Sequence, residues 1–285
     1  METSRRLPDL TMNYRDSGGD GPLVVLLHGW PQTSYCWRLV EPLLAEHFRV
    51  VAPDLRGYGL SDKPVTGYDK ARMAQDIREL VTVLGYDTVR LVGHDRGARV
   101  AHRFALDYPE ALTHLSLLDI CPTLHTFRSG TPETARGYWH WLFHMKPDLP
   151  ELLVGANVDA YLRYFFEHWA VQRAAVEEAI PHYVAAFSRP GALRAGFDDY
   201  RATIPDLELD SADFEAGRQI MIPTQLLWGE GGLVGGTDVL AAWRPFAPRA
   251  SGQELAGCGH FLPEEQPLVL AELLLAYLLT ETARS

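Results

Sequence analysis

The sequence LVGHDRGARVAHRF at residues 91–104 constrains the fold of this 285-residue chain more than any other segment. An apolar run typical of a buried strand meets a Gly-x-x-x-Gly turn, from Gly93 to Gly97, and a helical sequence follows at once. Glycine lets the backbone turn sharply, so that the side chain at the middle of the turn projects outwards. This pattern is the strand–turn–helix context of a nucleophile elbow, and Asp95 stands at its tip.

An Asp at this position determines which chemistry the elbow can support. An esterase or lipase carries Ser there, whereas a carboxylate nucleophile attacks saturated carbon and forms a covalent alkyl ester. Asp95 therefore predicts the cleavage of carbon–halogen bonds or epoxides, rather than of esters or amides.

Two arginines follow the Asp, with Arg96 next to it and Arg99 three residues further on. Residues three apart share a helix face, so both guanidinium groups are expected near Asp95. Each guanidinium offers a fork of donors that matches the two oxygens of a carboxylate, which predicts a substrate that is itself a carboxylate. The alternative is that one arginine pairs with a nearby acid such as Asp107 or Asp119.

Alternating apolar strands and amphipathic helices precede and follow a long helical stretch. This βαβ rhythm predicts a mostly parallel sheet with helices on both faces. Residues from about 125 to 215 are instead rich in aromatic residues and helix formers. We expect residues 1–124 and 216–285 to form the α/β core and residues 125–215 to form a helical cap over the carboxyl ends of the strands. The expected strands cover 22–29, 47–55, 88–95, 112–120 and 220–229, and the expected core helices cover 73–85, 96–109 and 267–281.

A base and an acid must assist the nucleophile, in the chain order nucleophile, acid, base. His260 lies in the glycine-flanked loop GCGHFLP before the final helix, so we expect it to be the base. Asp119, at the end of the strand after the elbow helix, is favoured as the acid that orients the imidazole. Glu230 and Asp238, in the turn WGEGGLVGGTD, are the alternatives.

Backbone N–H groups are expected to stabilise the oxyanion of the ester intermediate. The turn HGWP at residues 28–31 follows the first strong strand, which predicts the backbone N–H groups of Trp30 and Arg96 as the oxyanion hole.

Composition bounds the remaining function classes. A formal net charge of −11 argues against nucleic acid or an anionic membrane as a partner. The three cysteines, Cys36, Cys121 and Cys258, have no paired spacing that would indicate disulfides or a zinc site. No apolar signal segment is visible at the start, and no stretch approaches the ~18 apolar residues of a membrane helix. We expect a soluble cytoplasmic protein that acts on a small molecule without a metal or cofactor.

The chain resembles the α/β-hydrolase superfamily over its whole length, and the fluoroacetate dehalogenases in particular. The pair DRGARVAHR and GHFLPEE is specific to this resemblance, and Arg96 stands where haloalkane dehalogenases and many epoxide hydrolases carry Trp. Cys121 and Glu230 depart from the family pattern, and Glu230 could perturb His260. The matching stretches are HGWPQT (28–33), DLRGYGLSDKP (54–64), GHDRGARVAHR (93–103), DICPT (119–123), YWHW (138–141), LPELLVGA (149–156), DYRA (199–202) and GHFLPEEQP (259–267).

The resemblance implies an α/β-hydrolase fold with an inserted helical cap, a homodimer, and a role for each matching residue. It implies that Asp95, Asp119 and His260 form the catalytic triad and that Arg96 and Arg99 clamp the substrate carboxylate. It also implies that His140, Trp141 and Tyr200 bind halide and that Trp169 lines the pocket; without the resemblance, YWHW would be interpreted as core of the cap.

These inferences predict a hydrolytic dehalogenase that converts 2-halo carboxylates to 2-hydroxy acids. An epoxide hydrolase with the same triad is the first alternative, and the cap tyrosines, among them Tyr161 and Tyr200, would then protonate the epoxide oxygen. A non-enzymatic ligand receptor is the second alternative, and the pairing of Asp95 with His260 argues against it.

Overall fold

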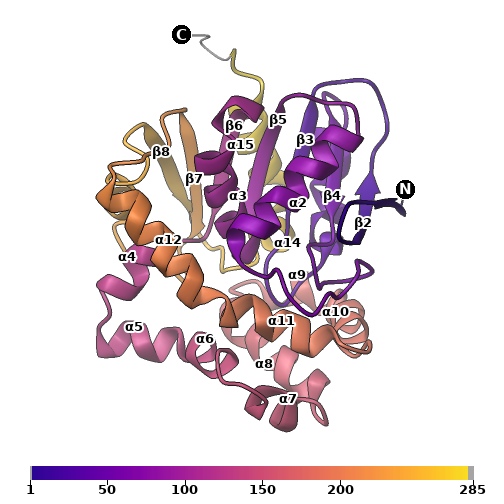
Figure 1. The fold of residues 1–285 in the computed structure, drawn as a ribbon, viewed down its shortest axis with the longest axis vertical. Coiled ribbons are helices and arrows are strands. Elements are labelled where there is room, and N and C mark those ends of the chain that lie inside the picture. Colours follow the sequence, from indigo (N-terminus) through magenta and orange to yellow (C-terminus); the bar gives the residue numbers. More distant parts are fainter. Residues whose placement is uncertain (1, 282–285) are drawn as a thin grey trace.

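An eight-stranded sheet forms the centre of the computed structural model, which describes residues 2–281 (Figure 1). Its strand order is β1-β2-β4-β3-β5-β6-β7-β8. The six neighbouring strands β4, β3, β5, β6, β7 and β8 run parallel, whereas β2 is antiparallel to both β1 and β4. The strands are β1 Glu2–Arg6, β2 Thr11–Asp16, β3 Leu23–Leu27, β4 Arg49–Pro53, β5 Val89–His94, β6 Leu112–Leu118, β7 Thr224–Gly229 and β8 Ala250–Leu255.

The central strands are apolar because helices cover both faces of the sheet. All five residues of β3 are buried, as expected for a parallel strand with no solvent-facing side. Helices α2 and α3 pack together on one face, and α1 and α15 pack together on the other (Figure 1). The predicted mostly parallel sheet flanked by helices is confirmed. The helices outside the β6–β7 connection are α1 Glu41–Leu44, α2 Lys70–Val83, α3 Arg96–Asp107, α13 Val239–Trp243, α14 Leu262–Glu265 and α15 Pro267–Leu278, with short 3₁₀ helices at Ser34–Leu39 and Pro109–Ala111.

The connection between β6 and β7 forms nine helices, which we call the cap. Most of the cap lies at one end of the sheet, the lower end in Figure 1, while α12 runs back beside α3. The division of the chain at residues 124 and 215 stays a prediction. The cap helices are α4 Thr123–Arg128, α5 Pro132–Gly137, α6 Trp139–His144, α7 Leu149–Val154, α8 Val158–Trp169, α9 Arg173–Glu177, α10 Ile180–Phe187, α11 Ala192–Arg201 and α12 Thr203–Glu215.

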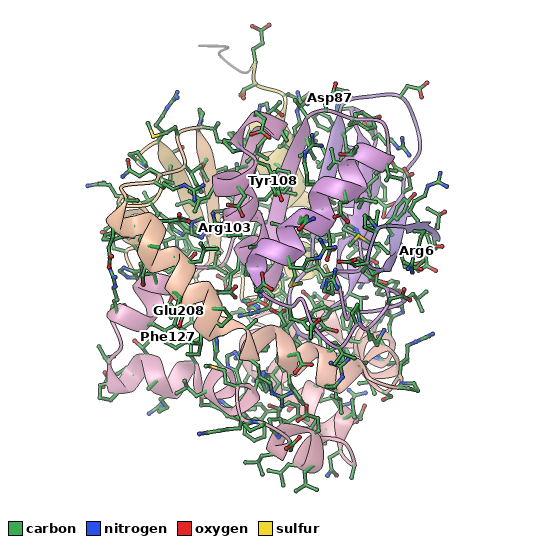
Figure 2. All side chains as sticks on the ribbon, viewed as in Figure 1. Arg6, Asp87, Arg103, Tyr108, Phe127 and Glu208 are labelled. Carbon is green, nitrogen blue, oxygen red and sulfur yellow. The ribbon has the colours of Figure 1, made fainter. Side chains whose placement is uncertain are left out.

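Buried ion pairs join the cap to α2 and α3. Arg103, which lies where α3 passes α12, pairs with Asp213 of α12 (Figure 2). Lys70 is the first residue of α2. Its Nζ lies 3.6 Å from Oδ2 of Asp206 in α12 and also forms an ion pair with Asp199 of α11. Breaking such a pair leaves a charge buried without its partner, at a typical cost of about 3–5 kcal/mol. These contacts therefore fix the cap on the sheet.

Within residues 2–281, no helix combines the length and the apolar character needed to cross a membrane.

Candidate active site

The elbow predicted at Asp95 is present between β5 and α3. Asp95 has φ of 49° and ψ of −117°, a left-handed conformation that non-glycine residues adopt at a cost of about 1–3 kcal/mol. Gly97 has no room for a side chain, because a Cβ would overlap the backbone of β3 and the carbonyl of His28. Because the turn packs so closely against β3, the Asp95 carboxylate projects out of the turn. The carboxylate is buried, with 7% of the residue exposed.

The turn at Trp30 supplies a backbone donor to Asp95, the candidate nucleophile. The N–H of Trp30 donates to Oδ1 of Asp95 at 2.9 Å. A Cβ on Gly29 would overlap the Asp95 side chain, so glycine permits the approach. Arg96, whose backbone N–H is the second predicted oxyanion donor, is the first residue of α3. An oxygen bound at this point would therefore meet the amino-terminal end of a helix, which favours negative charge.

His260 lies between two carboxylates. Its Nδ1 is 2.6 Å from Oδ2 of Asp119, and its Nε2 is 4.0 Å from Oδ2 of Asp95. Asp119 follows β6 with φ of 52° and also accepts hydrogen bonds from the N–H groups of Gly229 at 3.2 Å and Leu233 at 3.0 Å. These bonds hold the carboxylate in place, so that it fixes the orientation of the imidazole.

Neighbouring charges shift two pKa values within the candidate triad. Burial opposes ionisation of His260, but the hydrogen bond to Asp119 and the charges of Asp119 and Asp95 outweigh it and raise the pKa of the imidazole. Burial acts against the Asp95 carboxylate as well, yet the neighbouring histidines and arginines lower its pKa. Asp95 is therefore ionised and able to act as a nucleophile at neutral pH.

The alternative acid, Glu230, is directed elsewhere. It lies on the surface, where its Oε2 accepts a hydrogen bond from the N–H of Gly257 at 2.8 Å. Among the three acids considered from the sequence, the structure brings Asp119 to His260.

The two arginines differ in their partners. Nη2 of Arg96 donates to Oδ1 of Asp199 at 2.6 Å, and this pair is almost inaccessible to solvent. Nη1 of Arg99 donates to the carbonyl of Cys121 at 3.2 Å and to Oγ1 of Thr123 at 2.9 Å, both of them neutral acceptors. Burial and the charge of Arg96 lower the pKa of Arg99, although an arginine remains cationic. Arg99 is thus a buried cation for which the described residues provide no carboxylate partner.

The aromatic residues predicted to bind halide surround the arginines. His140 is buried, and burial lowers the pKa of its imidazole to about 3, so that the ring is neutral. Its Nδ1 has no hydrogen-bond partner within the described part of the chain. The Tyr200 ring lies 4.4 Å below the guanidinium of Arg96. The indole N–H of Trp141 donates to Oγ1 of Thr203 at 2.7 Å, while the Trp141 ring lies 4.4 Å from the guanidinium of Arg99.

Trp169 lies between His260 and a cavity that opens at the junction of cap and sheet. Its ring centroid is 5.2 Å from that of His260 and 4.8 Å from that of His140. The cavity has a volume of about 510 Å³ and is lined by residues of both parts, including Arg136 and Gly232. A Cβ on Gly232 would overlap Asp119, so the cavity reaches close to the triad.

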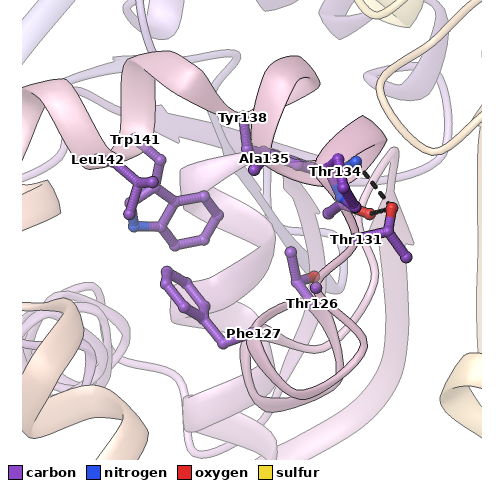
Figure 3. A pocket seen from close by; sticks show the side chains of 10 residues that line it. Thr126, Phe127, Thr131, Thr134, Ala135, Tyr138, Trp141 and Leu142 are labelled. Atoms are coloured by element: carbon purple, nitrogen blue, oxygen red, sulfur yellow. Dashed lines mark hydrogen bonds between the residues drawn. The ribbon is translucent and has the colours of Figure 1, made fainter.

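A second, mostly apolar cavity of about 360 Å³ lies between α4, α5 and α6 (Figure 3). Phe127, Tyr138 and Trp141 contribute aromatic rings to its lining. Trp141 therefore contacts both this cavity and the guanidinium of Arg99.

Two acidic residues close to the site were not predicted from the sequence. Asp199 precedes Tyr200 in the DYRA stretch and holds Arg96, and Glu265 contacts the loop that carries His260. Both lie in stretches that carry the family resemblance, which is the signal that could have found them. No group of three or more His, Cys, Asp or Glu side chains within residues 2–281 is arranged to hold a metal ion.

Comparison with known proteins identifies relatives along almost the whole chain. Residues 22–267 match the family model described as the alpha/beta hydrolase fold. A soluble epoxide hydrolase from Corynebacterium sp. (strain C12) is 40% identical, and the match covers 93% of each chain. A fluoroacetate dehalogenase from Burkholderia sp. is 39% identical over 95% of this chain and 91% of its own. The solved structure of ALR0039 from Nostoc sp. PCC 7120 has a TM-score of 0.94 and 44% identity, covering 99% of this chain and 98% of that one.

Proposed function

Because the chain belongs to the α/β-hydrolase family, we propose that it is a hydrolytic dehalogenase of 2-halo carboxylates. The observation that carries this proposal is the buried cation Arg99. Among the described residues, its guanidinium donates hydrogen bonds to neutral acceptors only. A buried charge without a carboxylate in direct contact is costly, and a bound anion would relieve that cost. A substrate with a carboxylate beside its reactive carbon would supply the anion close to Asp95.

The proposed reaction begins with in-line displacement at the α-carbon. The Asp95 carboxylate forms a C–O bond as the carbon–halogen bond breaks, and halide leaves with the bonding electron pair. Arg99 holds the substrate carboxylate. Arg96, whose charge is balanced by Asp199 and whose guanidinium lies over the Tyr200 ring, is the second proposed contact of the substrate carboxylate. The product of this step is an alkyl ester of Asp95.

Hydrolysis of that ester completes the proposed cycle. His260, oriented by Asp119, removes a proton from a water molecule that attacks the carbonyl carbon of the Asp95 ester. The oxyanion is stabilised by the backbone N–H of Trp30, which already lies 2.9 Å from Oδ1 of Asp95. As this intermediate collapses, His260 returns its proton to the leaving oxygen and a 2-hydroxy acid is released; loss of the second water proton to solvent restores the Asp95 carboxylate.

Neutral donors on the cap would stabilise the departing halide. His140 has an imidazole that stays neutral, and Tyr200 has a phenol whose pKa is raised by burial, so each retains a proton to donate. Trp141 is the third proposed donor, and its indole N–H would have to exchange Thr203 for halide.

An epoxide hydrolase is the second candidate function, and the hydrogen bond from Trp141 to Thr203 favours it. With that indole engaged, His140 and Tyr200 remain as a pair of donors, which is sufficient for the single oxygen of an opening epoxide. The similarity to a soluble epoxide hydrolase supports this reading as well. A neutral epoxide, however, gives Arg99 no anion to bind.

A substrate panel separates the two functions. Halide release is measured with an ion-selective electrode for fluoroacetate, chloroacetate and an aromatic 2-halo acid, and diol formation is measured for styrene oxide. The proposal predicts halide release and 2-hydroxy acid in equal amounts, with slow or undetectable diol formation. Rapid diol formation without halide release would refute the dehalogenase and support the epoxide hydrolase.

A further inference from the structure

The Glu265 carboxylate accepts four backbone hydrogen bonds at the edge of the active site. Its Oε2 accepts from the N–H groups of Gly259 at 2.9 Å, Val171 at 2.8 Å and Gln172 at 2.9 Å. Its Oε1 accepts from the N–H of Phe261 at 2.9 Å. The side chain is buried, with 4% of the residue exposed. A carboxylate suits this position because it accepts hydrogen bonds at both oxygens and donates none.

These four donors come from two parts of the molecule. Gly259 and Phe261 flank His260, so Glu265 holds the chain on both sides of the catalytic base. Val171 and Gln172 belong to the cap and follow α8. The N–H of His260 itself donates to the carbonyl of Trp169, the last residue of α8, at 2.8 Å. All three successive N–H groups around His260 are thus held either by Glu265 or by the end of a cap helix.

We propose that Glu265 is the positioning residue of His260 and that it couples the catalytic base to the cap. The inference rests on the proposed ester intermediate, because it assigns Glu265 to one half of the reaction. Asp95 forms the ester without proton transfer, whereas hydrolysis of the ester requires His260 to accept a proton from water. A displaced imidazole would therefore slow hydrolysis and leave the first step almost unchanged.

The neighbouring Glu264 provides a matched control. It is also buried at the end of the same short helix, but it contacts Arg38 and Gln32 and makes no hydrogen bond to the His260 loop among the described residues. Glutamine at position 264 or 265 keeps the size of the side chain. In Glu265→Gln, the amide NH₂ would face at least one backbone N–H, so that a donor meets a donor and one hydrogen bond of the loop is lost.

The experiment measures both half-reactions with chloroacetate by rapid quench. The chloride burst reports ester formation, and mass spectrometry of the quenched protein reports the ester on Asp95. We expect Glu265→Gln to keep a full burst while hydrolysis slows by roughly 10- to 100-fold, since small displacements of a catalytic group have effects of this size. The ester should then accumulate in the steady state, and Glu264→Gln should behave like the wild type.

Two results would overturn the inference. One is an equal decrease of both rates in Glu265→Gln, which would indicate a general loss of structure. The other is unchanged hydrolysis. If Glu265→Gln does not fold, Glu265→Asp is measured in the same way, because its shorter side chain can reach the His260 loop or the cap but not both. Absence of chloride release from the wild type would instead refute the proposed dehalogenase, and the two half-reactions would then be measured with styrene oxide, which would also esterify Asp95 in an epoxide hydrolase.

The pH profile provides a second readout that a merely structural role would not change. The negative charge of Glu265 is one of the contributions that raise the pKa of His260, after those of Asp119 and Asp95. Its removal should shift the acid limb of ester hydrolysis to lower pH, because the imidazole then loses its proton more readily. An unshifted acid limb in Glu265→Gln contradicts an electrostatic effect of Glu265 on His260.

Discussion

The guanidinium of Arg96 and the carboxylate of Asp199 form a buried ion pair that compensates the positive charge next in sequence to Asp95, the proposed nucleophile. Nη2 and Nε of Arg96 lie 2.6 Å and 3.2 Å from Oδ1 of Asp199. Tyr58 donates its hydroxyl to Oδ2 of the same carboxylate at 2.6 Å, and Lys70 pairs with it as well. The two arginines next to Asp95 are therefore unequal, and Arg99 is the one that an anionic substrate would neutralise.

This difference predicts that Arg99 discriminates between charged and neutral substrates. Replacing Arg99 with Leu removes a charge-assisted contact worth about 1.5–3 kcal/mol, so kcat/KM for chloroacetate should fall by roughly 10- to 200-fold. Chloroacetamide, which lacks the carboxylate, should be a poor substrate of the wild type and should lose little further activity. The measurement is kcat/KM for both compounds with both proteins.

Arg99→Lys serves as the control, because it keeps the positive charge but not the planar geometry of the guanidinium. We expect partial recovery with chloroacetate, because an ammonium group cannot reproduce the planar fork of the guanidinium. If Arg99→Leu lowers kcat/KM for the acid and the amide equally, Arg99 has a structural role, and the epoxide hydrolase becomes the better interpretation.

Replacement of Asp95 by Asn should abolish turnover in either candidate reaction. An amide is not a nucleophile under these conditions, so no ester can form. Halide release and diol formation are measured over long incubations, with circular dichroism to check that the variant is folded. Sustained activity of the folded variant would show that Asp95 is not the nucleophile.

The parts of the site that depend on local chain geometry were accessible from the sequence. The Gly93 to Gly97 turn places Asp95 at its tip because only glycine fits beside β3, and this requirement is visible in the residue pattern. Likewise, the continuous apolar residues of β3 predict a buried parallel strand. By contrast, β8 has the sequence ASGQEL and is mostly exposed, so its hydropathy carries no strand signal.

The parts that depend on tertiary contacts were not accessible. Asp199 meets Arg96 across 103 positions of sequence, and no periodic pattern indicates which acid an arginine will choose. The sequence alternatives for such a pairing were Asp107 and Asp119, but Asp107 pairs with Arg103 and Asp119 with His260. The role of Glu265 likewise depends on its contacts with Val171 and Gln172, more than 90 positions away.

Replacement of His260 by Asn should stop the reaction at the ester. Asn cannot accept the proton of the attacking water, while Asp95 remains able to displace halide. Mass spectrometry of the variant after incubation with chloroacetate should detect an adduct on the peptide that contains Asp95. In the wild type, a single turnover in heavy-oxygen water should label Asp95 before the product. Label in the product with none in the protein would indicate that water attacks the substrate carbon directly.

Asp210 of α12 should make the stability of the protein depend on pH. Burial, followed by the charge of Asp206, raises the pKa of its carboxyl from 3.8 to about 7. The folded state therefore binds more protons than the unfolded state between these values, so the free energy of unfolding should fall as pH rises from about 4 to about 7. Asp210→Asn removes the ionisation, and after allowance for solvent relaxation we expect a gain of about 1–2 kcal/mol at pH 8, or roughly 2–6 °C in Tm.

The same substitution should give no comparable gain at pH 4, where the folded carboxyl is already protonated. Thermal unfolding at pH 4 and pH 8 is compared for the wild type, Asp210→Asn and Glu208→Gln, an exposed position on the same helix that serves as the control (Figure 2). The control should leave Tm nearly unchanged at both values, because an exposed side chain pays little desolvation cost. A raised pKa would be contradicted if Asp210→Asn changed Tm equally at pH 4 and pH 8, or if it lowered Tm at pH 8. Only a group that is neutral at pH 4 and charged at pH 8 in the folded protein makes the increase in Tm larger at pH 8.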